Sequence, residues 1–448
     1  MLVVAAPICR RRRRKPNTEI AFALGRPLDC AVQERRTALL VGAGFSIDMG
    51  MPLVKGLTQD LFGPLTIDKL NEINSRSTTG PGDHFPQDVL DEFAPILARS
   101  TNDPSFHYEK VLGWLQERSF TGGAGKKDFY HLYQWLVEQV SYRLGDRHID
   151  NGRHMKASTH RYGGLVKLAK RNNPLWIFSL NHDLCVEMIS GQFGIPVSCG
   201  YAKDIVRLPR RNQQGELLGV LAFETLARDS LLNRTLQFST TGINLVKLHG
   251  SLDVFAIDDG ERYLRLRPRI ASVDGWIEAL RQVNTELLWM EDGKVFPTHP
   301  TNEIGFTDHN GKFAILSRTL LAGEFKFDKR VHAYAPPELL HVFDDKISEI
   351  DTLTTIGYSF GDKHINDIIC RWMEANASRQ LVVVDPYGKM PEFWSGPADR
   401  VVLARISAVE YLDSLYDGGM GLERVLSAAL RRRGVAWPRW ERGASRPR

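Results

Sequence analysis

The stretch TALLVGAGFSIDMGMP, residues 37–52, determines how the rest of the chain is interpreted. Its apolar run from Thr37 to Val41 stops at glycine instead of continuing with helical spacing, which predicts a short buried strand. Gly42 and Gly44 place no side chain between the backbone and a ligand, so successive N–H groups of this loop can point at a phosphate. Gly50 and Pro52 predict the start of a helix, whose N-terminus would favour the same anion. Taken alone, a glycine pair after a strand is equally compatible with an ordinary tight turn.

Three later stretches end in the same way, with an apolar β-rich segment passing into a polar cluster. They are IFSLNHD (177–183), NLVKLHGS (244–251) and TTIGYSFGDKHIND (354–367). Ligands of open parallel sheets bind in the crevice outside the carboxyl ends of the strands, so four such stretches indicate one site. Strands and helices alternate from residue 174 onward. This pattern predicts an α/β fold, with a Rossmann-like parallel sheet that carries helices on both faces.

Residues 53–173 interrupt this pattern and predict a mainly helical insertion module. Its segments 89–100, 106–119 and 129–144 space apolar residues by three and four, as in amphipathic helices. Aromatic residues at the same spacing, such as Trp114 and Tyr133, are expected in the core of the module. Residues 207–237 are compatible with a strand followed by a helix, and residues 291–311 with an exposed loop. Segments 252–257 and 262–268 can form a hairpin.

Charge is distributed unevenly along the 448 residues, although the net charge is only +5. Residues 10–15 carry six positive charges, and residues 431–448 carry seven arginines against Glu441. Without these two segments the chain is mildly acidic, so an attraction to nucleic acid would belong to the tails. We expect residues 1–36 to be a disordered basic extension, residues 37–430 to form the main domain and residues 431–448 to form a basic tail.

The five cysteines, Cys9, Cys30, Cys185, Cys199 and Cys370, are odd in number and widely spaced. This pattern indicates a reducing compartment and argues against a disulfide framework. No apolar run is long enough to span a bilayer, and the charges at the N-terminus follow the apolar residues, the reverse of a secretory signal. We therefore expect a cytoplasmic protein without a membrane partner. No Walker-type phosphate loop is present, which disfavours a P-loop ATPase.

Candidate catalytic groups stand at the ends of the predicted strands. His249 ends an apolar segment, where an imidazole can accept a proton from a hydroxyl at neutral pH. Asn181 and Asp183 follow another strand, although both residue types also favour turns and helix caps. Ser46 can bond a phosphate or cap the next helix. The cluster of Asp362, His364 and Asp367 lacks a fourth metal ligand, so we expect a helix cap and no metal site.

Together these residues resemble the sirtuin superfamily. GAGFSIDMGMP is similar to its cofactor loop, SLNHD to its Asn-x-Asp segment, KLHGS to the strand end with the catalytic histidine, and IGYSFGD to the strand that contacts the adenosine half of NAD. The long motif with FGDKHIND most resembles the sirtuin-like NADases of bacterial anti-phage defence. The paired cysteines of the sirtuin zinc ribbon are absent, and Leu53 to Lys55 replace the Asp-Phe-Arg of the deacylase form.

The resemblance implies a role for individual residues. His249 would act as the base or orient the ribose, and Asn181 would hold the ribose or the attacking water. The implied NAD-binding residues are Gly42, Ala43, Gly44, Ser46, Asp183, Gly250, Gly357, Ser359 and Asp385. Tyr358 stands where the family has threonine.

The activity implied is hydrolysis of NAD+ to nicotinamide and ADP-ribose, with NAD as substrate, in an abortive-infection defence against phage. A homo-oligomer and a partner such as a HerA-type ATPase are expected as means of control. Two alternatives remain open at the level of sequence. One is a sirtuin-type protein deacylase or ADP-ribosyltransferase, and the other is a non-catalytic subunit that senses NAD or ADP-ribose.

Overall fold

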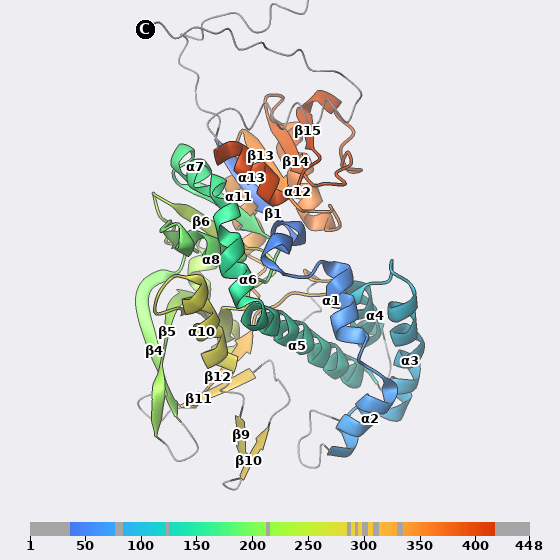
Figure 1. Ribbon diagram of the computed structural model, residues 1–448. Coiled ribbons are helices and arrows are strands. Elements are labelled where there is room, and N and C mark those ends of the chain that lie inside the picture. Colours follow the sequence, from blue (N-terminus) through green and yellow to red (C-terminus); the bar gives the residue numbers. More distant parts are fainter. Residues whose placement is uncertain are drawn as a thin grey trace, which may run out of the picture. The chain divides into compact units, whose positions relative to one another are not determined.

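The computed structural model describes residues 36–76, 84–121, 125–211, 216–284, 288–291, 294–297, 303–307, 313–328 and 335–416 (Figure 1). The two basic tails of the sequence lie outside these residues, except for Arg36, and so does the segment 417–430. The expectations for the tails therefore stay predictions.

The central sheet has seven strands, all parallel, in the order β15-β14-β13-β1-β2-β6-β3. Its register pairs Val41 with both Ile356 and Ser179, and pairs Ser179 with Lys247. The carboxyl ends of four central strands therefore stand level with one another at one edge. The strands are β1 (Thr37–Val41), β2 (Leu175–Ser179), β3 (Val197–Ser198), β6 (Ile243–Lys247), β13 (Thr352–Ile356), β14 (Gln380–Val384) and β15 (Val401–Ala404).

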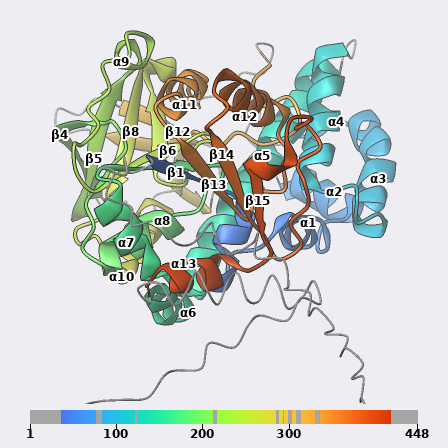
Figure 2. The same cartoon turned by 90° about the horizontal axis from the view of Figure 1, so that it is seen from above.

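Helices cover both faces of this sheet, because alternate residues of each strand point to opposite sides. In β1, Leu39 and Val41 pack in one core, and Ala38 and Leu40 pack in the other. The first face is covered by α7 (Gly164–Arg171), α8 (Cys185–Gln192) and α13 (Ala408–Tyr416), and the second by α11 (Leu339–Ile347) and α12 (Lys363–Ala375) (Figure 2). The predicted α/β fold, a Rossmann-like parallel sheet with helices on both faces, is confirmed.

The chain between β1 and β2 is mainly helical, as the fold prediction requires. Apolar side chains of its helices join the core on the first face of the central sheet, and Trp114 packs between Phe93 and Phe129 there. The elements are η2 (Ala43–Phe45), η3 (Ile47–Met49), α1 (Val54–Phe62), α2 (Ile67–Arg76), α3 (Gln87–Asn102), α4 (Tyr108–Thr121), α5 (Lys126–Asp150), α6 (Gly152–Ser158) and η4 (Thr159–Tyr162), followed by α7.

A second, antiparallel sheet of six strands was not expected from the sequence. Its order is β11-β12-β7-β8-β5-β4, and β9 pairs with β10 in a separate ribbon. The expected hairpin is present as β7 and β8, whereas the loop predicted for residues 291–311 instead contains β10, β11 and the last residue of β9. The elements are β4 (Ala202–Arg211), β5 (Leu217–Ala227), α9 (Arg228–Leu232), β7 (Val254–Ile257), η5 (Asp258–Gly260), β8 (Arg262–Arg267), α10 (Val273–Asn284), β9 (Leu288–Glu291), β10 (Lys294–Pro297), β11 (Glu303–Thr307) and β12 (Phe313–Arg318).

Within the described part of the chain, no helix combines the length and the apolar character needed to cross a bilayer.

Candidate functional site

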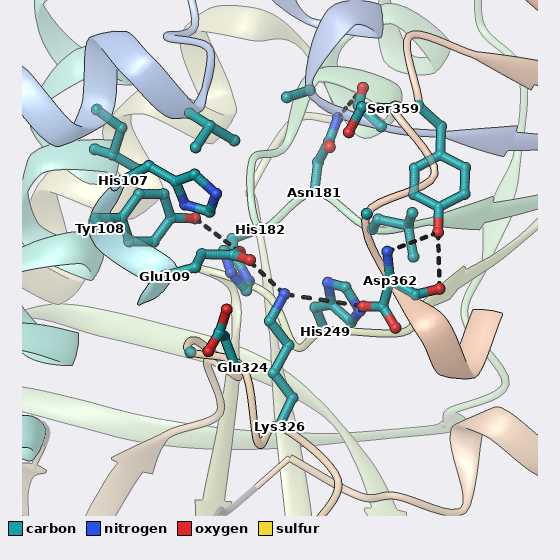
Figure 3. A pocket seen from close by; sticks show the side chains of 18 of the residues that line it. His107, Tyr108, Glu109, Asn181, His182, His249, Glu324, Lys326, Ser359 and Asp362 are labelled. Atoms are coloured by element: carbon teal, nitrogen blue, oxygen red, sulfur yellow. Dashed lines mark hydrogen bonds and ion pairs between the residues drawn. The ribbon is translucent and has the colours of Figure 1, made fainter. Parts of the chain in front are cut away.

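A cavity of about 600 Å³ opens at the carboxyl ends of β1, β2, β6 and β13 (Figure 3). Its volume lies within the range that binds small ligands and cofactors. The end of the parallel sheet forms one wall, and the beginning of α4 together with residues 323–327 forms another. Seven of the eleven residues for which the sequence implied a catalytic or NAD-binding role line the cavity: Gly42, Ala43, Asn181, Asp183, His249, Gly357 and Ser359.

Two N–H groups of the glycine loop make backbone hydrogen bonds within the protein. Gly42 donates its N–H to the Ile356 carbonyl and Gly44 donates to the Gly357 carbonyl, each at 3.0 Å. A Cβ on Gly42 would lie 2.6 Å from the Gly357 oxygen. These two glycines therefore allow two strand ends to meet closely, and their N–H groups face a neighbouring strand and not the cavity. The helix predicted at Gly50 and Pro52 is present, because α1 begins at Val54, after two short 3₁₀ turns in residues 43–49.

Asn181 is fixed against this loop by its amide group. Its Nδ2 donates to the Gly42 carbonyl at 2.9 Å and to Ser46 Oγ at 3.2 Å. Because a carbonyl oxygen only accepts hydrogen bonds, the amide nitrogen must be the atom on that side. The amide oxygen of Asn181 is thus left as the acceptor for a ligand in the cavity. Ser46 itself is buried, does not line the cavity and serves as a partner of Asn181.

Asp183 combines a place in the cavity wall with a local structural function. Its Oδ1 accepts a hydrogen bond from the Cys185 N–H at 3.0 Å, in the first turn of α8. Its carbonyl oxygen accepts from the buried Nζ of Lys247, at the end of β6. The cap that a polar residue favours at this position is therefore present, and it does not exclude ligand contact, because the residue lines the cavity.

His249 follows the end of β6 and is 5% exposed. Its Nε2 lies 2.9 Å from Asp362 Oδ2, within hydrogen-bonding distance. When Nε2–H donates to that carboxylate, Nδ1 is the nitrogen free to accept a proton. Burial and the nearby Lys326 cation lower the pKa of His249, while Asp362 and Glu109 act in the opposite direction. The histidine is therefore neutral at pH 7 and suited to act as a base.

Asp362 occupies the N-cap position of α12, as expected, but its carboxylate makes no capping hydrogen bond. It points instead to His249, and its own N–H donates to the Tyr358 hydroxyl at 3.2 Å. Burial alone would raise the pKa of Asp362, but His249 and Lys326 hold it well below its usual range. Asp362 is thus a largely buried anion whose carboxylate lies beside the histidine.

Two side chains of the cavity wall were given no chemical role by the sequence, because they come from the other wall. Glu109 lies in the first turn of α4, and Lys326 belongs to the segment after β12. Lys326 Nζ lies 2.9 Å from Glu109 Oε1 and 3.9 Å from Asp362 Oδ2. The sequence alone assigned no chemistry to the segment that contains Lys326.

His182, between the two predicted residues of its loop, also lines the cavity. It is 8% exposed, and its Nδ1 has no hydrogen-bond partner in the part of the chain that the structure describes. Burial, followed by the proximity of His249, lowers the pKa of His182 to about 3. The cavity therefore holds a second imidazole that stays neutral across the physiological range.

The remaining predicted residues support the site or lie outside it. Gly250 has a φ of 80°, and a Cβ there would come 1.7 Å from the Thr319 carbonyl, so glycine is required where the loop after β6 passes the residue that follows β12. Gly250 does not line the cavity, and neither does Gly44. Asp385 follows β14, also outside the cavity wall, and its Oδ1 accepts from the Tyr387 N–H at 2.7 Å. Ser359 lines the cavity and is exposed.

Among the described residues, no group of three or more His, Cys, Asp or Glu side chains is arranged to hold a metal ion. Cys185, Cys199 and Cys370 are free thiols.

No family model matches the sequence, and no curated protein matches it. Among solved structures, the chain is similar to a sirtuin analysed for the structural basis of substrate affinity, at 12% identity and a TM-score of 0.38 over 86% of this chain and 95% of that one. It is also similar to a Sir2 homologue in complex with NAD, at 14% identity and a TM-score of 0.35 over 88% and 91% of the two chains. A mutant Sir2 homologue in complex with ADP-ribose gives 13% identity and a TM-score of 0.35 over 88% and 94%. Scores of this size do not establish membership of a family.

Proposed function

We propose that this chain is an NAD+ glycohydrolase, which converts NAD+ and water to nicotinamide, ADP-ribose and a proton. The observation that carries the proposal is that Asn181 and the His249–Asp362 pair open into one cavity at the carboxyl edge of a Rossmann-like sheet. Dinucleotides bind at this edge in folds of this class. The motif set that resembles the sirtuin superfamily supplies the four strand ends that surround the cavity.

The reaction breaks the bond between the ribose C1′ and the nicotinamide nitrogen. The electron pair of that bond goes to the ring nitrogen, which loses its positive charge, and the ribose passes through an oxocarbenium-like state. The Asn181 amide oxygen would hold a ribose hydroxyl or the attacking water. His249 Nδ1 would take a proton from that water or hydroxyl, and Asp362 would stabilise the imidazolium formed. The proton is then released to solvent, which balances the reaction.

The test is NAD+ consumption by the purified chain, alone and with the proteins encoded beside it, followed by separation of the products. We expect nicotinamide and free ADP-ribose in equal amounts. His249→Ala leaves Asp362 paired with Lys326 and should fold, yet lose about 10²–10⁴ in kcat, because general-base help is gone. Wild-type turnover by His249→Ala or by Asn181→Ala would refute the assignment of these residues.

The product distribution also separates this activity from its rivals. A deacylase would form an acyl-ADP-ribose only when an acyl-lysine peptide is present, and a transferase would leave ADP-ribose on a protein. A sensing subunit would bind NAD+ without any turnover.

We further propose, from the resemblance of the motifs, that the chain acts in the cytoplasm as an effector of anti-phage defence by NAD+ depletion. An enzyme that drains NAD+ must be inactive until triggered, so control by a homo-oligomer or by a partner such as a HerA-type ATPase belongs to this proposal. Co-purification from the native operon, with light scattering to measure mass, tests it. Recovery of a monomer without any partner would contradict it.

A further inference from the structure

Four charged or titratable side chains form a continuous row along the cavity wall, from the helical module to the proposed base (Figure 3). Glu109 Oε1 lies 2.9 Å from Lys326 Nζ, which lies 3.9 Å from Asp362 Oδ2, which lies 2.9 Å from His249 Nε2. The side chains of Lys326, Asp362 and His249 are 9%, 12% and 6% exposed. Charges so poorly hydrated interact more strongly than charges on a protein surface.

Lys326 is held in this row by the segment that carries it, residues 319–328. The carbonyl of Ala322 accepts a hydrogen bond from the Tyr133 hydroxyl at 3.1 Å, and the N–H of Phe325 donates to Gln116 Oε1 at 3.1 Å. Both partners are buried side chains of the helical module. The Glu109 carboxylate, which accepts from the Tyr108 hydroxyl at 3.2 Å, then fixes the ammonium group itself. The position of Lys326 is therefore fixed by backbone hydrogen bonds of its segment and by the ion pair of its ammonium group.

A buried carboxylate beside a histidine ordinarily favours the charged imidazolium, which cannot act as a base. Here the carboxylate of Asp362 also faces a cation. The groups that face His249 are Asp362 from the loop before α12, Lys326 from the segment after β12, Glu109 from α4 and His182 from the loop after β2. Lys326 offsets the negative charge of Asp362. Asp362 can therefore orient the imidazole without stabilising its protonated form.

We propose that Lys326 is a positioning residue of this site, which holds Asp362 and keeps His249 in its neutral form, and that Glu109 anchors Lys326. The expected effect on turnover rests on the proposed NADase activity. The expected effect on the charge state of His249 rests on the geometry of the four side chains. The helical module thereby gains a role, because its Glu109 holds Lys326 beside the residues at the end of the central sheet.

The kinetic test compares the pH dependence of kcat/KM for Lys326→Met, Lys326→Arg and Glu109→Gln with that of the wild type. Lys326→Met should lose about tenfold at pH 7, a part of the full effect of a general base, and its acid limb should move to higher pH. Lys326→Arg keeps the charge and should keep the wild-type profile, while Glu109→Gln should move the limb less than Lys326→Met. Lys346→Met removes an ion pair with Glu349 elsewhere and serves as the matched control.

Some outcomes would overturn the proposal. Lys326→Met with an unchanged acid limb, whether its activity is kept or is lost equally at every pH, would leave Lys326 with a structural role only. If Lys326→Met fails to fold, Lys326→Arg and Glu109→Gln decide the matter, because the first preserves the positive charge and the second preserves the size of the side chain. A shifted limb in Lys326→Arg as large as that expected for Lys326→Met would contradict the role of the charge.

A second measurement needs no turnover. Histidine side chains labelled with ¹⁵N are titrated by NMR in the wild type and in Lys326→Met, and His249→Gln identifies the signal of His249 among the 13 histidines. We expect His249 to take up its proton at higher pH when Lys326 is absent. This shift without any NAD+ consumption would refute the NADase proposal and support the positioning role. NAD+ consumption with an unchanged titration would do the reverse.

Discussion

At the scale of the residue, the orientation of the Asn181 amide depends on the hydrogen bonds of its nitrogen, and a substitution at Asn181 can test that orientation. Its Nδ2 donates to the Gly42 carbonyl, and this contact fixes the amide oxygen toward the cavity. Asn181→Asp keeps the shape of the side chain but turns the donor into a second acceptor. A buried carbonyl and a carboxylate oxygen would then face each other.

Asn181→Asp should therefore lower the free energy of unfolding by about 1–3 kcal/mol, the cost of a buried polar group without a partner. Urea unfolding at pH 7 measures this loss, with Ser359→Ala as a variant at the exposed end of the cavity wall. An Asn181→Asp protein as stable as the wild type would contradict the described orientation of the amide.

His182 makes a second prediction at this scale, for stability as a function of pH. Burial lowers its pKa to about 3 in the folded state, whereas an unfolded histidine titrates near 6.5. Between these values the unfolded chain binds one more proton at this position. Its contribution to stability is therefore complete above about pH 6.5, and it is lost by about 1.4 kcal/mol per unit as the pH falls toward 3.

This contribution can be isolated by measuring the free energy of unfolding at pH 7, 6 and 5 for the wild type and for His182→Gln. The variant should lose less stability than the wild type over this range. His341→Gln, at an exposed position, is the control and should behave like the wild type. Parallel curves for the wild type and His182→Gln would show that His182 does not stay neutral in the folded protein.

The site residues at strand ends could be predicted from the sequence, but the charged side chains that contact them from other parts of the chain could not. Asn181 and His249 follow apolar runs, and strand ends of one parallel sheet must share an edge, so their meeting follows from local patterns. Glu109 and Lys326 are separated by 217 residues, and neither stands at the end of a strand of the parallel sheet. Only the docking of residues 319–328 on the helical module brings them together, and no local pattern encodes that contact.

At the scale of the element, the close meeting of the β1 and β13 strand ends depends on glycine. Gly357 has a φ of 63°, and a Cβ there would lie 2.4 Å from Gly44 Cα. Gly194 has nearly the same φ, 64°, but nothing lies within 4 Å of the position of its Cβ. An alanine would have the same backbone strain at both positions, because φ is nearly the same. Only at position 357 would its Cβ also collide with a neighbouring strand end.

Gly194→Ala should cost about 1–2 kcal/mol, the price of a left-handed conformation. Gly357→Ala should cost clearly more, and it should also reduce activity, because the displaced strand end lines the cavity. Thermal unfolding of the two variants gives the comparison directly. Equal losses would mean that the two strand ends are not in close contact.

The elements were predictable where the hydrophobic pattern is simple. Buried parallel strands are short apolar runs, and those around the cavity were found in this way. Of the second sheet, only the hairpin of β7 and β8 was predicted. Even there the pattern is mixed, because β8 buries Arg265, which pairs with Asp253 at 2.9 Å, among apolar residues. In a sequence, the charged residues of a buried ion pair look like residues of an exposed surface, because charged side chains are usually exposed.

At the scale of the whole molecule, a ligand that fills the cavity should stabilise the fold, because it contacts the sheet, the helical module and residues 323–327 together. ADP-ribose at a concentration 100 times its Kd should add about 2.7 kcal/mol, or raise the Tm by about 3 °C. Differential scanning fluorimetry with increasing ADP-ribose measures this shift. Adenosine at the same concentration is the control, since it lacks the second, terminal ribose of ADP-ribose that is expected at Asn181. An equal shift with both would contradict the proposed placement of that ribose.

The measurement that tests the NADase proposal most directly is the reaction in water labelled with ¹⁸O, followed by mass spectrometry. Hydrolysis at C1′ must transfer one oxygen from water, so we predict ADP-ribose that carries a single ¹⁸O, together with free nicotinamide. His249→Ala should form both products about 10²–10⁴ times more slowly. Consumption of NAD+ with ADP-ribose bound to a protein or to an acyl group, or no consumption even with the neighbouring gene products, would contradict the proposal.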